Sequence, residues 1–263
     1  MVGYVLLIVL VAFVFDFING FHDSANSIAT VVGTRVLSPL AAVIWAATFN
    51  FAAAFTVGTA VAKTVGSGMI KPDAVTPSVI LAALLGAIVW NLITWFYGLP
   101  SSSSHALLGG FAGSAVARYG TAAIIPAGWT KTLIFIVLSP VIGMLLGLGL
   151  MVAVYWIFRR SPPGKVDRWF RGAQLASSAF FSLSHGANDA QKTMGLIVGL
   201  LVASQSVFAN QTGLLAHLHL TTTDTIPYWV EIGAYSAIAL GTLFGGWRIV
   251  HTMGSRITKL QPV

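Results

Sequence analysis

The sequence contains no cysteine, and charged residues are scarce. Of its 263 residues, 8% are Asp, Glu, Lys or Arg, whereas 56% are hydrophobic. The absence of cysteine excludes disulfide bonds, thiolate metal sites and cysteine nucleophiles. A soluble domain carries about 25% charged residues. This composition, with a mean hydropathy of +0.85, therefore predicts a polytopic membrane protein with no separate soluble domain.

The net charge of +7 does not predict a nucleic-acid partner, because the basic residues are spread over short loops rather than gathered in one patch. In membrane proteins, Lys and Arg mark cytoplasmic loops. The first apolar run has no basic leader and no Ala-x-Ala cleavage site, so we expect a retained membrane span rather than a signal peptide.

Long apolar runs recur along the chain, and a membrane-spanning helix needs about 20 such residues. We expect an all-α fold with spans near 3–33, 38–66, 78–97, 131–158, 174–203 and 228–247, and a shorter helical piece at 98–118. The spans 3–33 and 174–203 carry polar motifs, where we expect the helices to be interrupted. The segment 159–171 has two adjacent prolines and five basic residues, which makes it the clearest linker.

The basic residues also predict an orientation. If the linker is cytoplasmic, nine Lys and Arg residues fall on the inner side and four on the outer side, and Lys192 lies within a span. The inner set is Arg35, Arg159, Arg160, Lys165, Arg168, Arg171, Arg248, Arg256 and Lys259, and the outer set is Lys63, Lys71, Arg118 and Lys131. This asymmetry favours an external amino terminus. With the shorter piece 98–118 counted as a crossing, five crossings precede the linker, so a repeat that begins after it would insert upside down.

A repeat is visible at a constant offset of 166 residues, which matches Gly20 with Gly186 and Asp23 with Asp189. The same offset matches Phe15 with Phe181, Val32 with Val198, and Gly33 with Gly199. The Asp pair matters most, since the chain has only seven acidic residues. Inverted repeats with interrupted helices are a transporter architecture. We therefore predict a first repeat at 1–158, a basic cytoplasmic linker at 159–173 and a second repeat at 174–263.

The first polar motif runs from Asn19 to Asn26 (Asn-Gly-Phe-His-Asp-Ser-Ala-Asn) within an apolar stretch. Ionisable groups at membrane depth are costly and mark functional sites. On a helix, Asn26 shares a face with Asp23, three residues away, and His22 shares one with Asn19. Carboxylate and amide oxygens suit hard cations such as Na⁺, and a carboxylate can carry a proton. Alternatively, Asp23 caps a half-helix or pairs with Lys192.

Asp16 lies close to this motif and can also face the bundle. Its role is open between helix packing and a proton relay.

The second polar motif is a turn, Gly98-Leu-Pro-Ser101-Ser102-Ser103-Ser104-His105, that precedes an apolar helix. Hydroxyl groups and free backbone N–H groups at the start of a helix form an anion site, and the helix dipole favours negative charge there. An N-cap with a polar turn is the simpler alternative. Because one cap does not need four serines, we favour an oxygen-rich anion such as phosphate or sulfate.

The third motif is Asn188-Asp189-Ala-Gln191-Lys192, which resembles the first but has Lys192 where Asn26 stands. Lys192 either neutralises Asp189 or contacts an anion. Gln191 is a further candidate oxygen ligand.

Three segments resemble the signatures of the inorganic phosphate transporter (PiT) family: Gly20–Thr30, Gly98–His105 and His185–Lys192. The resemblance covers nearly the whole chain. It implies an inverted-repeat fold, symport of phosphate driven by Na⁺ or H⁺, in some members as a neutral metal–phosphate complex, and a homodimer. It places binding positions at Asp23, Asn26, Ser102, Ser103, Ser104, Asn188 and Asp189. The family usually has Ser-Thr-Thr before the histidine, so Ser103 and Ser104 keep the hydroxyl and lose a methyl group.

A larger departure from the family lies at the carboxyl terminus. Family members carry a second Ser/Thr-His turn after the second acidic motif, whereas this sequence ends at Val263, where that stretch would begin. We therefore expect the second repeat to be incomplete. Either the sequence is truncated, which we favour, or this protein assembles its site in another way.

The resulting hypothesis is a plasma-membrane symporter of inorganic phosphate, with no enzymatic activity, resident cofactor or metal centre. Asp23, Ser102, Ser103, Ser104 and Asp189 are predicted to bind the substrate. Asp23, Asn26, Asn188 and Asp189 are predicted to bind the coupling ion, with His22, His105, Gln191 and Lys192 as further candidates. Three alternatives stay open: a sulfate permease of the same family, an intramembrane hydrolase that uses a serine and His105, and a passive anion channel.

Overall fold

The computed structural model describes residues 1–56, 58, 62 and 68–257, and this part of the chain contains helices but no β-strand. Its α-helices are α1 (Val2–Gly33), α2 (Pro39–Ala52), α4 (Pro77–Phe96), α5 (Ser103–Tyr119), α6 (Pro126–Phe158), α7 (Pro163–Ala203), α8 (Gln205–Phe208), α9 (Tyr228–Phe244) and α10 (Trp247–His251). Short 3₁₀-helices lie at Ala53–Phe55, Pro72–Ala74, Thr121–Ala123 and Gly213–Leu218, and a π-helical turn at Thr252–Ile257. The all-α prediction is confirmed.

Proline and serine determine where several helices begin. Pro39, Pro77, Pro126 and Pro163 stand in the first turns of α2, α4, α6 and α7, where the missing N–H would have no intrahelical partner. The N-cap of α5 is Ser102, whose hydroxyl accepts a hydrogen bond from a backbone N–H of the first turn.

Three helices in the described part, α1, α4 and α6, are long and apolar enough to cross a membrane, which agrees with the predicted polytopic membrane protein. The expected span 38–66 is shorter as a helix, because α2 ends at Ala52 and most of 57–66 lies outside the described residues. The connection after α6 is also shorter than expected. Since Pro163 begins α7, only 159–162 are non-helical, and most of the basic segment 159–173 is helix.

The expected interruptions of spans 3–33 and 174–203 need correction. Both α1 and α7 run without a break through their acidic motifs. An interior glycine costs a helix only about 1 kcal/mol, and here it permits close packing instead. A Cβ on Gly20 would lie 2.1 Å from the carbonyl oxygen of Ile238, and one on Gly186 would lie 2.4 Å from that of Asn50. The breaks occur elsewhere, at 97–102 between α4 and α5 and at Gly245–Gly246 between α9 and α10.

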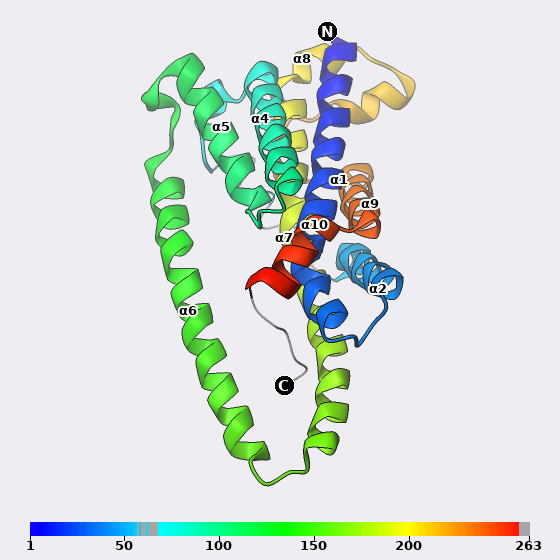
Figure 1. Ribbon diagram of the computed structural model, residues 1–263. Coiled ribbons are helices and arrows are strands. Elements are labelled where there is room, and N and C mark those ends of the chain that lie inside the picture. Colours follow the sequence, from blue (N-terminus) through cyan, green and yellow to red (C-terminus); the bar gives the residue numbers. More distant parts are fainter. Residues whose placement is uncertain (57, 59–61, 63–67, 258–263) are drawn as a thin grey trace.

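The helices α1 and α7 lie side by side at the centre and run antiparallel (Figure 1). Asp16 bonds Thr193, the carbonyl of Ser27 bonds Ser178, and Thr34 bonds Gln174, so positions ascend along α1 as they descend along α7. The α4–α5 hairpin packs on one side of this pair, and α2 and α9 pack on the other. Helix α6 stands apart from the body and has no buried residue.

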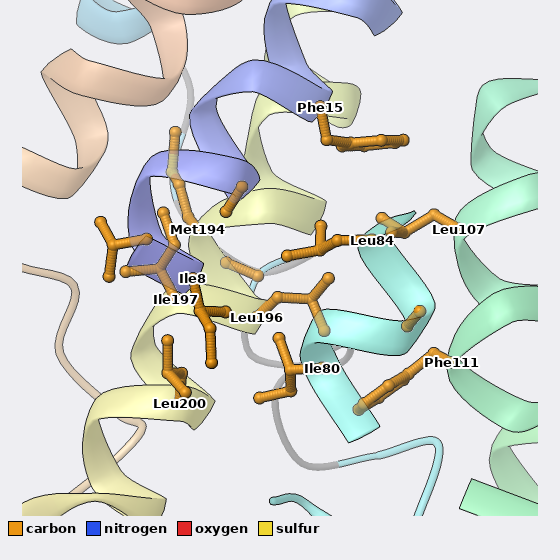
Figure 2. Close-up of a cluster of buried hydrophobic side chains, with 14 of the residues drawn as sticks. Ile8, Phe15, Ile80, Leu84, Leu107, Phe111, Met194, Leu196, Ile197 and Leu200 are labelled. Atoms are coloured by element: carbon orange, nitrogen blue, oxygen red, sulfur yellow. The ribbon is translucent and has the colours of Figure 1, made fainter. Parts of the chain in front are cut away.

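Apolar side chains hold the central helices and the hairpin together (Figure 2). Phe15 of α1, Leu84 of α4, Leu107 of α5 and Met194 of α7 are buried in one cluster. Burial of a side chain of this size contributes about 1.5–3 kcal/mol when it leaves water. This cluster fixes the depth at which α1, α5 and α7 face one another, and so positions the polar motifs that lie next to it on these helices.

Candidate functional site

Two carboxylates, one from each central helix, meet around His185. The Nε2 atom of His185 lies 3.8 Å from Oδ2 of Asp23 and 3.5 Å from Oδ2 of Asp189. One ligand atom from each of these three residues lies within 4.8 Å of the other two. Asp23 and Asp189 are only 7% and 8% exposed. The two acidic motifs therefore form one buried site, which we call the acidic cluster (Asp23, His185 and Asp189).

The contacts across the helix pair follow the sequence offset of 166 residues. Asn19 donates to Asp189 at 3.4 Å, and His185 faces Asp23. The offset matches Asn19 with His185 and Asp23 with Asp189. The two contacts are therefore equivalents of each other, as an antiparallel pair of related helices requires.

His185 is held from behind by α2 and α9. Its Nδ1 atom lies 3.2 Å from Oδ1 of Asn50, and Nδ2 of Asn50 donates to the hydroxyl of Thr242 at 2.8 Å. Nε2 is buried and has no hydrogen-bond partner in the described part of the chain. The ring thus presents to the space between the two carboxylates a nitrogen that contacts both of them without a hydrogen bond.

His22 fastens Asp23 to the α4–α5 hairpin. Its Nδ1 is 2.8 Å from Oδ1 of Asp23, and its Nε2 is 2.9 Å from the hydroxyl of Thr94 on α4. An ionised carboxylate only accepts hydrogen bonds, so Nδ1 donates to Asp23. In the structure, His22 therefore orients the carboxylate of Asp23.

Lys192 joins the acidic cluster to the serine turn. Its ammonium group contacts Oδ1 of Asp189 and donates to the hydroxyl of Ser104 at the start of α5. Of the alternatives for Lys192, the pairing with Asp189 is the one observed, and its partner is not Asp23. The charge of Asp189 is thus compensated within α7, while among the described residues that of Asp23 is met only by histidines.

Three of the four serines before His105 are predicted site residues, and they have different surroundings. The Ser102 hydroxyl accepts from the backbone N–H of His105 at 3.2 Å and caps α5. Ser103 is fully buried, and its hydroxyl has no partner among the described residues. Ser104 bonds Lys192. The side chain of His105 is exposed, and its link to Ser102 uses the backbone. A Ser–His nucleophile and base pair is therefore not formed in this turn.

Some predicted residues lie outside these contacts. Asn26 is exposed, and Asn188 is exposed and donates to the carbonyl of Ser184 at 2.8 Å. Gln191 is buried and donates to the carbonyl of Gly58 at 2.6 Å, so this amide ties α7 to the segment after α2. Asp16 is fully buried and accepts from Thr193 at 2.6 Å.

Sequence reasoning overlooked several members of the site. His185 precedes Asp189 by four residues, and this helical spacing was a usable signal, because it places both side chains on one face. Thr94 and Asn50 carried no such signal, since each reaches the site from a helix far away in sequence.

The arrangement favours a bound cation. Two carboxylate charges about 5 Å apart repel by about 3 kcal/mol at an effective dielectric constant of about 20. Lys192 offsets part of this repulsion. Carboxylate oxygens suit Na⁺, and an imidazole nitrogen extends the set to transition metals. A proton shared with Nε2 of His185 is equally compatible with this chemistry.

The chain is similar to bacterial proteins described as probable low-affinity inorganic phosphate transporters. That of Rhizobium meliloti (strain 1021) is 53% identical over 256 residues, which are 97% of this chain and 73% of that protein. That of Bacillus subtilis (strain 168) is 46% identical over 260 residues, which are 98% of this chain and 74% of that protein.

The model of the phosphate transporter family matches residues 19–165 and 159–263, which overlap in the basic segment after α6. Among solved structures, one described as the sodium-dependent phosphate transporter superposes with a TM-score of 0.84. It is 21% identical, and the match covers 99% of this chain and 80% of that one. At this identity the likeness establishes the fold.

Proposed function

This chain belongs to the phosphate transporter family, and from that premise we propose that it is a secondary active transporter that carries inorganic phosphate together with Na⁺ or H⁺. The observation that carries the proposal is the acidic cluster. It is buried between two antiparallel, sequence-related helices, and Lys192 links it to the start of α5.

Coupling follows from charge. Phosphate and the two carboxylates repel one another, so an oxyanion binds favourably only when cations are present. A cation between Asp23 and Asp189, next to Nε2 of His185, removes that repulsion. By linkage, phosphate raises the affinity for the cation by the same factor. Alternation between two orientations of the site then converts this mutual dependence into driven transport.

The phosphate position that we propose lies at the start of α5. Hydroxyls of Ser102, Ser103 and Ser104 stand at this helix terminus, where backbone N–H groups and the helix dipole favour an anion. The fully buried Ser103 hydroxyl, which has no partner among the described residues, supports this placement. The cations bound to Asp23 and Asp189 would lie between these carboxylates and the anion.

The coupling ion would be held by Asp23 and Asp189, with Asn26 and Asn188 completing the sites. Asn26 lies one helical turn from Asp23, and both amides are exposed. The carboxylate and amide oxygens support Na⁺, as does the description of the structural neighbour as sodium-dependent. The imidazole of His185 is an argument for H⁺ as the coupling ion instead, because this ring can bind a proton. A divalent metal that travels with phosphate would be part of the cargo.

The remaining expectations belong to the same proposal: two inverted repeats divided near 159–173, an external amino terminus, a location in the plasma membrane and a homodimer. The antiparallel course of α1 and α7, with equivalent contacts Asn19–Asp189 and His185–Asp23, supports the inverted repeat.

The test is uptake of ³³P-labelled phosphate by proteoliposomes that contain the chain. We expect accumulation above equilibrium under an inward Na⁺ or H⁺ gradient, and none above equilibrium without one. Uptake that only reaches equilibrium under every gradient would contradict symport and identify a passive anion channel. Competition by unlabelled sulfate as strong as that by phosphate would identify a sulfate permease.

A further inference from the structure

Lys192 is the one formal positive charge of a side chain in direct contact with the acidic cluster among the described residues. Resting on the function proposed above, we propose that its ammonium group is a tethered cation. It would occupy, in the second half of the site, the place that a mobile coupling ion takes in the first half. The chain would therefore bind phosphate with one coupling cation fewer than a site with two equivalent halves.

The first argument is positional. The offset of 166 residues that matches Asp23 with Asp189 also matches Asn26 with Lys192. Both residues stand three positions after their aspartate, on the same helix face. The two halves of the site thus differ at one position beside the carboxylate, where one carries a neutral amide and the other carries a charge.

The second argument is the coordination of the ammonium group. Lys192 contacts a carboxylate oxygen of Asp189 and the hydroxyl oxygen of Ser104, from two different helices. Oxygen atoms of these types are the ligands that a hard cation would use. The ammonium group stands where such a cation would lie. In the other half, Asn26 is exposed and makes no side-chain hydrogen bond within the described part.

The consequence is an asymmetric requirement for ions. The charge of Asp189 is compensated permanently, because Lys192 is three residues away on the same helix. The charge of Asp23 faces His22 and His185, whose rings are charged only when they bind a proton, so it still needs a mobile cation or a proton before an anion enters. Lys192 also brings its positive charge to Ser104, where the phosphate is proposed to bind.

The test measures how strongly phosphate binding depends on cations. Binding of ³³P-phosphate to the purified full chain in detergent is titrated against Na⁺ at fixed pH, with choline as the replacement, and against pH at fixed Na⁺. Each cation bound with phosphate adds about one to the slope of the logarithm of the association constant against the logarithm of the cation concentration.

We expect Lys192→Asn to raise the Na⁺ slope by about one, so that a tenfold drop in Na⁺ weakens phosphate binding about tenfold more than in the unmodified chain. Asn26→Lys is the reciprocal variant at an exposed position, and it should lower the summed cation slope by about one. Lys131→Asn makes the same chemical change at an exposed site on α6 and should leave the slopes as they are.

Unchanged slopes in both site variants would overturn the inference while leaving the proposed function intact, provided that the unmodified chain binds phosphate in a cation-dependent way. Absence of phosphate binding by the unmodified chain would instead refute the proposed function and this inference with it. If Lys192→Asn fails to fold, Asn26→Lys decides the question by itself.

Discussion

Neutralising Asp23 should separate ion binding from phosphate binding. In Asp23→Asn the side chain keeps its size, but the site loses the negative charge that contacts His22 and His185. The repulsion between Asp23 and Asp189 is present with and without a bound cation, so it cancels from the affinity for that cation. The attraction between Asp23 and the cation does not cancel.

The expected loss is large. A unit charge about 4 Å from a carboxylate is attracted by about 4 kcal/mol at an effective dielectric constant of about 20. Because about 1.4 kcal/mol corresponds to a factor of ten, Asp23→Asn should weaken binding of the coupling cation about a thousandfold. Phosphate itself is repelled by Asp23, so its binding in the absence of the cation should become tighter in the variant.

The assay compares two readings on the same preparation: gradient-driven ³³P-phosphate uptake by proteoliposomes, and phosphate binding in cation-free buffer. We expect the first to disappear and the second to increase. Asp73→Asn, the same change at an exposed residue next to α4, is the control and should behave like the unmodified chain. Gradient-driven uptake at the unmodified rate in Asp23→Asn would refute the reasoning, and so would an unchanged cation-free affinity.

Two further predictions concern packing and the serine turn. Gly20→Ala should lower the free energy of unfolding by about 1–3 kcal/mol, because its Cβ would lie 2.1 Å from a carbonyl oxygen of α9. Gly143→Ala on exposed α6, with no atom within 4 Å of its Cβ, should instead be neutral or stabilising. Thermal unfolding in detergent measures the stability of both variants. Equal midpoint temperatures for the two variants would contradict the packing argument. Ser102→Ala removes the cap of α5 and should cost about 1 kcal/mol of stability. Ser104→Ala removes a hydroxyl that bonds Lys192 and should weaken phosphate binding about tenfold, as expected for loss of one charge-assisted hydrogen bond; the same loss of binding in Ser139→Ala, at an exposed position on α6, would contradict a specific role for Ser104.

The central helices show how far pattern reasoning reaches. Hydropathy alone predicted the spans that became α1 and α6, because a helix in a membrane must be apolar over a length set by the bilayer. The rarity of acidic residues in such runs singled out Asp23 and Asp189. A buried charge is energetically costly in a membrane, so ionisable residues there mark functional sites.

Glycine and lysine show where that reasoning ends. Gly20 predicted a break in the helix, yet the helix is continuous and the glycine serves close contact with α9. The local sequence cannot distinguish these outcomes, because a glycine costs a helix little free energy. Whether the glycine stabilises or destabilises the fold depends on whether another backbone packs against it. Lys192 likewise had two candidate partners, Asp189 or an anion. Its contact with Asp189 lies within α7, whereas its contact with Ser104 depends on where α5 begins.

The sequence by itself determined that this protein is a bundle of membrane helices with two related acidic motifs and a serine turn, because composition and spacing are properties of the chain alone. Only the tertiary structure decided that Asp23 and Asp189 both lie next to His185. It also decided that Asn50 contacts His185, that Thr94 contacts His22, and that α1 and α7 continue unbroken through the acidic motifs. These features depend on contacts between residues far apart in sequence, and such contacts exist only once the antiparallel helices have packed.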